Sequence, residues 1–214
     1  MSVEERTMTK KDMILDVLKT ESKDNNTRGT KWISYVIGDM AHIGQYRDNG
    51  QHYFTHPKHC VNMFYDLVSI EGWIRFSVLE EHEIPYGVIE LAYLHDVVED
   101  TVITHEDVKD IFTELGYKDF FEQYLDIPLK LITHDKKEDY DTYIDKVMEH
   151  PASSFVKMLD LADNMNLFGL GKLEDTELAR VMRYAKYFKR INDKFHYLEK
   201  LKECFPDMVD AWND

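Results

Sequence analysis

Residues 91–101 read L-A-Y-L-H-D-V-V-E-D-T. The first four continue an apolar pattern that predicts a helix over residues 86–97, and the rest add one imidazole and three carboxylates at or just beyond its end. Residues four apart lie almost above each other on a helix, so His95 should share a face with Glu99, and Asp96 with Asp100. Buried charges of this kind are costly unless they are paired. The stretch therefore predicts a helical protein with a polar site.

These side chains resemble a ligand set for a divalent metal ion. Imidazole and carboxylate together suit first-row metals, and crowded carboxylates raise one another's pKa unless a cation neutralises them. Residues 95 and 96 supply two ligands, so others must come from distant segments. His56 opens a predicted helix in Y-F-T-H-P, and residues 155–167 read F-V-K-M-L-D-L-A-D-N-M-N-L. We expect one aspartate of that apolar segment, Asp160 or Asp163, to face inward.

Glycine and proline are scarce in this chain, at 9 and 5 of 214 residues, and apolar residues recur at three- and four-residue steps. This pattern predicts an all-α protein without strands. Thr104 should cap one helix and Gly116 should end it. We expect a single domain over residues 1–214 with roughly nine to eleven helices. The expected helices lie near residues 13–18, 32–40, 57–69, 73–82, 86–97, 105–115, 117–132, 138–149, 153–169 and 175–203.

The charge balance limits the partners. The chain has 41 acidic and 26 basic residues, a formal net charge of −15. Nucleic-acid backbones and anionic membranes repel such a chain, so neither a nucleic-acid polymer nor a membrane is expected as a partner. A small polyanion can still bind where a few cationic side chains outweigh the surface charge. We expect a small-molecule ligand, and nothing in the sequence indicates an oligomer.

The cysteines and the N-terminus indicate a compartment. Cys60 and Cys204 lie far apart without a C-x-x-C partner, which predicts neither a disulfide framework nor a thiolate zinc site. The N-terminal residues are charged, and no apolar run approaches the roughly eighteen residues of a membrane-spanning helix. We expect an unprocessed, soluble protein in the reducing cytoplasm.

Two longer strings resemble a known family. Residues 41–57 read A-H-I-G-Q-Y-R-D-N-G-Q-H-Y-F-T-H-P, and residues 94–101 read L-H-D-V-V-E-D-T. Both are similar to motifs of the hydrolase half of RelA/SpoT proteins, which belong to the HD superfamily of metal-dependent phosphohydrolases. The resemblance covers about residues 36–190, leaving a helix and loop over 1–30 and a helical extension over 191–214. The length resembles the stand-alone small alarmone hydrolases, and the implied fold is an HD-domain helical bundle.

The resemblance implies a role for each matching residue. His56, His95, Asp96 and Asp160 would hold one divalent ion, and this donor set suits manganese. Aligning Val156-Lys157 with the family's V-K brings Asp160 onto the metal aspartate and Asn164 onto a later asparagine, which favours Asp160 over Asp163. Glu99 and Asp100 would orient and deprotonate the attacking water. The implied nucleotide contacts are Arg47, Lys136, Asn164, Arg180 and Tyr184.

The implied activity is removal of the 3′-pyrophosphate from guanosine 3′,5′-bispyrophosphate (ppGpp)-like alarmones of the stringent response. Two departures leave the nucleotide open: Asp48 stands where the family has a basic residue, and the segment Ser69–Tyr86 is longer than in compact members. One alternative is an HD phosphohydrolase for another nucleotide, such as a dNTP, a nucleoside monophosphate or a phosphorylated cofactor. A second is a nucleotide sensor without turnover.

Overall fold

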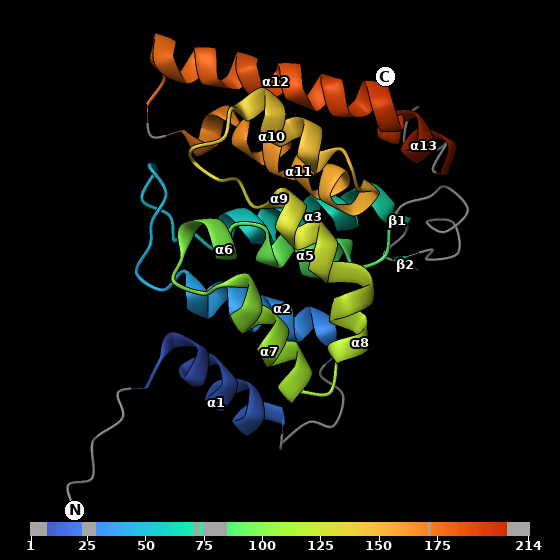
Figure 1. Cartoon of the computed structure of the whole chain (residues 1–214). Coiled ribbons are helices and arrows are strands. Elements are labelled where there is room, and N and C mark those ends of the chain that lie inside the picture. The colour runs from blue at the N-terminus through green and yellow to red at the C-terminus, as the bar shows by residue number, and fades with distance from the viewer. Residues whose placement is uncertain (1–7, 23–28, 71–72, 75–84, 171, 205–214) are drawn as a thin grey trace, which may run out of the picture.

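Apolar residues at helical spacing fold the chain into layers of helices (Figure 1). The computed structural model describes residues 8–22, 29–70, 73–74, 85–170 and 172–204. Its elements are α1 (Lys10–Ser22), α2 (Thr30–Ala41), α3 (Thr55–Val68), β1 (Ser69–Ile70), β2 (Trp73–Ile74), α5 (Val88–Leu94), α6 (Val97–Asp100), α7 (His105–Glu114), α8 (Lys118–Phe120), the π-helix η1 (Phe121–Leu125), α9 (Asp126–Ile132), α10 (Tyr140–Val147), α11 (Pro151–Asn164), the 3₁₀ helix η2 (Leu167–Gly169), α12 (Asp175–Phe195) and α13 (Tyr197–Cys204).

Helices α5 and α11 form the centre of the molecule. Nearly all of α5 is buried, including Leu91, Ala92 and Leu94, and a helix that is apolar all round belongs in a core. Helix α5 packs against α2, α3 and α11, and α11 also packs against α9 and α12. In Figure 1 the layers run from α12 at the top, through α10 and α11, to α2 and α1 at the bottom. Three of the residues nominated from the sequence lie on or directly after these central helices: His95 and Asp96 follow α5, and Asp160 lies on α11.

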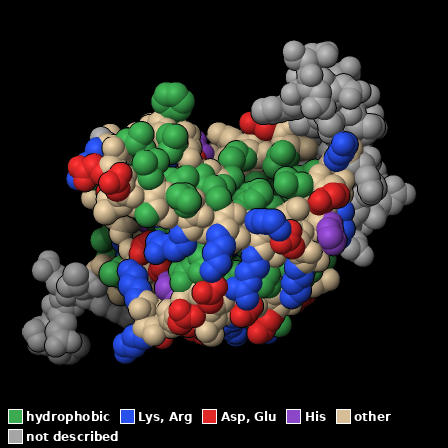
Figure 2. Space-filling view, turned by 90° about the horizontal axis from the view of Figure 1, so that it is seen from above, with side chains coloured by type: hydrophobic (Ala, Val, Ile, Leu, Met, Phe, Trp, Pro, Cys, Tyr) green, Lys and Arg blue, Asp and Glu red, His purple; other side chains and the backbone are tan. Residues whose placement is uncertain are grey.

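Helix α12 covers one side of this bundle. Its Arg190 guanidinium lies 3.2 Å from Asp141 and 2.5 Å from Asp145, both on α10. Figure 2 looks down on this side and shows hydrophobic side chains gathered beside basic and acidic ones. Leu178 and Met182 are exposed apolar residues of α12. The ion pairs with α10 and the packing of α12 against α11, with Tyr187 and Ile191 buried, hold α12 in place.

The predicted all-α class is confirmed, with one small exception. β1 and β2 form an antiparallel pair, so the expectation of no strands is wrong for these four residues. The helix predicted over 73–82 is wrong at its start, where an aromatic and a β-branched residue favour extended backbone, and residues 75–82 lie outside the described ones. The predicted single domain over 1–214 stays a prediction. No helix in the described ranges is long and apolar enough to cross a membrane.

Several helix ends are confirmed and others are wrong. The Thr104 side chain and Asp107 form a capping box at the start of α7, and Gly116 takes a positive φ of 84° beyond its end. The helix predicted over 86–97 ends earlier, at Leu94. The helix predicted over 175–203 breaks at His196, which adopts a left-handed φ of 54°. Apolar periodicity continues across such breaks, so it does not mark them.

A close approach between α2 and α5 helps to place the site. A Cβ atom on Gly38 would lie 2.6 Å from the Tyr93 carbonyl oxygen and would also clash with the Phe54 ring. Phe54 and Tyr93 pack their rings together 5.9 Å apart, two residues before His56 and His95 respectively. The missing side chain at Gly38 therefore sets the spacing of two segments that carry site residues.

We expect Gly38→Ala to lower the free energy of unfolding by about 1–3 kcal/mol, because the added methyl group overpacks this contact. Urea denaturation measures the change. Gly29→Ala is the control, since a Cβ atom there meets nothing within 4 Å and should cost less than about 1 kcal/mol. Equal losses in the two variants would contradict the packing argument.

Candidate metal centre and active site

Four side chains from three parts of the chain converge at one point. His56 lies in the first turn of α3, His95 and Asp96 lie between α5 and α6, and Asp160 lies on α11. The His56 Nε2 atom is 3.0 Å from Asp160 Oδ1, 3.3 Å from His95 Nε2 and 3.6 Å from Asp96 Oδ2. His95 Nε2 is 3.1 Å from Asp96 Oδ2. The structure thus brings together all four residues that the sequence nominated as metal ligands.

Both imidazole rings are anchored through their other nitrogen. The Nδ1 atom of His95 lies 2.8 Å from the Ala92 carbonyl oxygen, and Nδ1 of His56 lies 2.6 Å from Asp163 Oδ2. Each Nδ1–H donates to an oxygen, so each Nε2 lone pair is directed to the common point. Histidines that bind metals commonly have this arrangement.

The chemistry of these groups fits a cation. When both rings are neutral, two imidazole lone pairs and two carboxylates face one another as acceptors with no proton between them, so they repel one another. All four residues belong to the interior or border it: His56, His95 and Asp160 are buried, and the Asp96 side chain is 16% exposed. A divalent ion would satisfy all four at once, and oxygen with nitrogen ligands suits manganese or iron.

Without a metal, protons take part of this role. Burial lowers the pKa of His56, but hydrogen bonds to Asp160 and Asp163 raise it to about 9. The pKa of His95 is raised in the same way, mainly by the charge of Asp96 against the effect of burial. Burial raises the pKa of Asp160, but Lys157 and His56 hold it well below its usual range. Negative charge therefore persists here and attracts cations.

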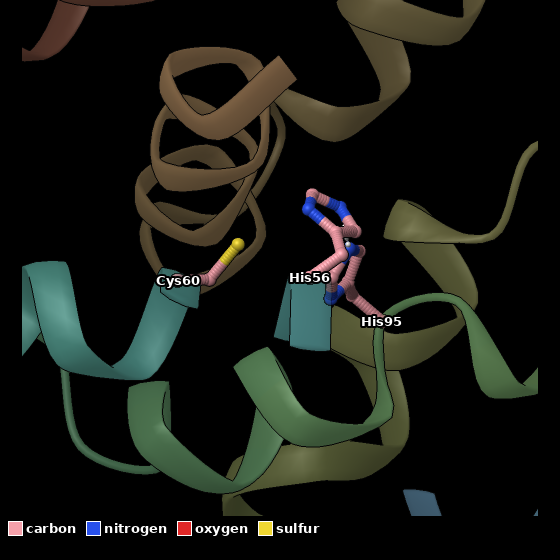
Figure 3. A group of neighbouring side chains, drawn as sticks. All are labelled: His56, Cys60 and His95. Carbon is pink, nitrogen blue, oxygen red and sulfur yellow. Dashed lines mark hydrogen bonds between the residues drawn. The ribbon is translucent and has the colours of Figure 1, made fainter. Parts of the chain in front are cut away.

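Cys60 lies beside the two histidines (Figure 3). The Sγ atom and one nitrogen from each of His56 and His95 lie within 4.8 Å of one another, so the three form a possible metal-binding group. However, complete burial raises the pKa of the Cys60 thiol well above its usual value, and nearby carboxylates add to this. A thiolate is the metal-binding form of cysteine. Asp96 and Asp160 are therefore the better anionic donors.

The two aspartates of α11 occupy different places. Asp160 Oδ1 lies on the Nε2 side of His56, also 3.9 Å from His95 Nε2. Asp163 lies on the Nδ1 side of His56, where it also accepts from Arg47 at 2.7 Å. Only Asp160 borders the point where the ring lone pairs meet. This geometry favours Asp160 over Asp163 as the fourth ligand.

Glu99 and Asp100, the candidate catalytic carboxylates, are held by α6 next to the ligands. Glu99 Oε2 accepts from the His134 backbone N–H at 3.1 Å, and burial raises its pKa. Asp100 lies 3.1 Å from the Tyr53 hydroxyl and 3.3 Å from Lys136 Nζ. A carboxyl with a raised pKa accepts a proton more readily, which favours Glu99 as the base.

A cavity of 260 Å³ is lined by Glu99 and by three of the candidate ligands, His56, Asp96 and Asp160. It contains most of the predicted site. Its lining includes the predicted contacts Arg47, Asn164 and Tyr184. Arg180 lines an adjoining hollow of 180 Å³ that shares Arg47, Asn164 and Tyr184 with the first. Within the described residues, the Arg180 Nε atom is buried without a hydrogen-bond partner. The complete lining of the main cavity is Arg47, Tyr53, His56, Asp96, Glu99, Tyr140, Lys157, Asp160, Asn164 and Tyr184.

Lys136 is placed differently from the other predicted contacts. It lies with Glu99 and Asp100 in a separate hollow of 490 Å³ that does not include the imidazoles, and its side chain is 73% exposed. The structure therefore brings Lys136 to the candidate catalytic carboxylates but not to Arg180.

Three residues that line the main cavity, Tyr53, Tyr140 and Lys157, were not nominated from the sequence, and two of them contact candidate site carboxylates. The Tyr53 hydroxyl lies 2.9 Å from Asp96 Oδ2 and 3.1 Å from Asp100 Oδ2, so it bridges a candidate ligand and a candidate catalytic residue. Lys157 Nζ lies 2.7 Å from Asp160 Oδ2, with a side chain only 12% exposed. A lysine three residues before an inward aspartate was an available signal. Tyr53 lies within the family-like string 41–57, but no role was assigned to it, because its contacts join segments distant in sequence.

Comparison with known proteins supports a relationship. Over 152 residues, 70% of the chain, it is 29% identical to the bifunctional (p)ppGpp synthase/hydrolase SpoT of Escherichia coli K12. This chain is similar in sequence to (p)ppGpp hydrolases. The guanosine-3′,5′-bis(diphosphate) 3′-pyrophosphohydrolase of Shigella flexneri matches equally, and that of Haemophilus influenzae is 33% identical over 77 residues, 36% of this chain.

The relationship covers only part of these proteins. The matched region is 19% of the E. coli protein and 9% of the H. influenzae protein. No family model matches the chain. The similarity supports the RelA/SpoT hydrolase resemblance and an enzyme of the hydrolase type, while the HD-domain assignment stays a prediction.

The metal-free protein should lose stability as the pH rises through neutrality. The pKa of His56 is raised from 6.5 to about 9 on folding, so its protonated form stabilises the fold fully below pH 6.5, and this contribution is lost through pH 9. We expect the free energy of unfolding in chelator to fall by a few kcal/mol across this range, measured by urea denaturation. A free energy of unfolding that does not change with pH would contradict the raised pKa of His56.

Saturating Mn²⁺ provides the matched condition. Metal binding requires deprotonated imidazoles, so the affinity for the ion rises with pH and offsets the loss. The fall seen in chelator should therefore be absent or reversed when Mn²⁺ is present. His56→Gln removes one of the two titrating rings and should make the fall in chelator smaller, because the pKa of His95 is also raised.

Proposed function

We propose that this chain is a metal-dependent nucleotide pyrophosphohydrolase that removes the 3′-pyrophosphate from guanosine 3′,5′-bispyrophosphate-like nucleotides. One observation carries the proposal: two imidazoles and two carboxylates converge at one point, and three of these groups, on His56, Asp96 and Asp160, line a cavity together with Glu99, whose pKa is raised. The similarity to (p)ppGpp hydrolases supports the choice of substrate. Because those proteins are far longer, the activity of this chain is inferred from its own site.

His56, His95, Asp96 and Asp160 would hold one divalent ion, which we propose to be manganese. The bound ion would supply Lewis acidity that lowers the pKa of water and neutralises charge on a phosphoryl oxygen. Lys157 pairs with the second oxygen of Asp160, leaving Oδ1 on the side of the imidazoles.

Glu99 would accept the proton from the attacking water. Water attacks the phosphorus attached to the 3′ oxygen, the bond between that phosphorus and the 3′ oxygen breaks, and pyrophosphate and a 3′ hydroxyl result. The alcohol takes up the proton that Glu99 received. Asp100 would accept a hydrogen bond from the Tyr53 hydroxyl, which also contacts Asp96. Tyr53 and Asp100 would therefore orient the metal ligand Asp96 relative to helix α6.

The nucleotide contacts follow from the lining of the two hollows. Arg47 donates to Asp163 at 2.7 Å and to Asn164 at 3.4 Å, and bonds in the plane of a guanidinium leave its faces for stacking on a base. Arg180 and Tyr184 would bind the phosphates and ribose from the adjoining hollow. Lys136 would neutralise phosphate charge only from the side of Asp100.

A second candidate is hydrolysis of another nucleotide. Asp48 lines the same hollow as Arg180 and adds negative charge where a bispyrophosphate would place its own. This observation favours substrates with fewer phosphates, such as a nucleoside monophosphate. We place either activity in the cytoplasm, because the buried Cys60 is a free thiol and such cysteines suit a reducing compartment.

A substrate panel tests the proposal. Purified protein with Mn²⁺ should release pyrophosphate from guanosine 3′,5′-bispyrophosphate faster than it releases any phosphate species from dNTPs or nucleoside monophosphates. Release of phosphate from a monophosphate alone would favour the second candidate. Tight binding of nucleotides without any turnover would favour a sensor.

Replacing the proposed base should separate chemistry from metal binding. We expect Glu99→Gln to lower kcat by about a hundredfold to ten-thousandfold, because the amide cannot accept the proton, while Mn²⁺ affinity measured by calorimetry changes little. Glu114→Gln makes the same substitution at an exposed ion pair with Lys19 and should keep full activity. Unchanged kcat in the Glu99 variant would remove Glu99 from the mechanism.

A further inference from the structure

One carboxylate that is outside the metal ligand set contacts both halves of the site. Asp163 is buried, with 6% of its surface exposed. Its Oδ2 atom lies 2.6 Å from His56 Nδ1 and 2.7 Å from the Arg47 guanidinium, and its Oδ1 atom lies 3.2 Å from His59 Nδ1. A single buried oxygen thus receives both a candidate metal ligand and a candidate nucleotide contact.

The first contact fixes the orientation of a ligand. An imidazole whose Nδ1–H donates to a carboxylate keeps its Nε2 lone pair free and directed to the metal, and loss of such a partner typically lowers metal affinity about 10- to 100-fold. Asp163 cannot itself join the ion from this side, because the His56 ring lies between them: Asp160 contacts Nε2 and Asp163 contacts Nδ1.

The second contact fixes a cation. Arg47 is mostly buried, with a side chain 14% exposed, and a buried guanidinium without a partner is costly. Asn164, the residue after Asp163, accepts from the same guanidinium at 3.4 Å. The orientation of Arg47 in the cavity therefore depends on the same turn of α11 that anchors His56.

We propose that Asp163 is a positioning residue that joins the metal centre to the nucleotide platform, by holding His56 in its Nδ1-protonated form and Arg47 in the cavity. The inference rests on the metal centre of the proposed function. Removal of Asp163 weakens metal binding even without a nucleotide, and it separately weakens nucleotide binding through Arg47.

Calorimetric titration of Mn²⁺ into the full chain, without nucleotide, tests the first half. Asp163→Ala should raise the Kd for Mn²⁺ about 10- to 100-fold, and Asp163→Asn, which keeps an acceptor oxygen, should recover part of that loss. Asp160→Ala, which removes a ligand, should lose far more. A Kd for Asp163→Ala within twofold of the wild type would overturn the proposal, as would a loss equal to that of Asp160→Ala.

His59→Ala is the matched control. The His59 side chain is 43% exposed and is the third donor to Asp163. Its removal leaves His56 and Arg47 in contact with the carboxylate. Its Kd for Mn²⁺ should stay within twofold of the wild type. A loss as large as that of Asp163→Ala would overturn the proposal, because the effect would then come from any change around this carboxylate.

Two further measurements complete the test. Nitrogen-15 NMR of the wild-type chain with diamagnetic Zn²⁺ should show the His56 proton on Nδ1; a proton on Nε2 would overturn the proposal even if the variants do not fold. Arg47→Ala should keep the wild-type Kd for Mn²⁺, whereas Asp163→Ala should weaken both metal and nucleotide binding. Because the metal titrations contain no nucleotide, they hold whichever substrate the chain hydrolyses, so failure of the substrate assay leaves this inference separately testable.

Discussion

Mutual repulsion among acceptor groups is the constraint on which the structure depends. Two imidazole nitrogens and two aspartate oxygens meet within 4 Å in the interior, where desolvation makes unpaired polar groups costly. Each group lies on or directly after a helix with a buried apolar face, so burying α3, α5 and α11 brings the polar atoms together. Only positive charge at their centre, as protons or a divalent ion, makes that packing favourable.

Positive charge is distributed around this point rather than through the protein. The chain has a net charge of −15, yet Arg47 and Lys157 line the main cavity and Arg180 the hollow beside it. Lys157 neutralises one aspartate and Arg47 another, which limits the repulsion that a polyanionic ligand would meet. A globally acidic surface and an anion-binding cavity are therefore compatible, because screening makes the near charges dominate.

The sequence predicted the parts whose signal is local. Apolar spacing indicated the helices, and the quoted motifs indicated His56, His95, Asp96 and Asp160, which the structure brings together. It could not predict the end of α5 at Leu94, since the same spacing continues through the turn, nor the contact of Tyr53 with Asp96 and Asp100, which depends on tertiary packing. Asp163 was weighed only as a metal ligand, because a sequence does not show on which side of a ring a carboxylate lies.

The arrangement separates the reaction from the choice of substrate. The proposed metal ligands and Glu99 lie on α3, on the α5–α6 segment and on α11, which pack in the core. Arg180 and Tyr184 lie on α12, and Asp48 lies on the loop before α3. Substitution on α12 or that loop changes the charge facing the nucleotide without moving a buried ligand. Asp48 is such a difference from the family-like string, so the proposed hydrolysis and the proposed choice of nucleotide depend on different residues.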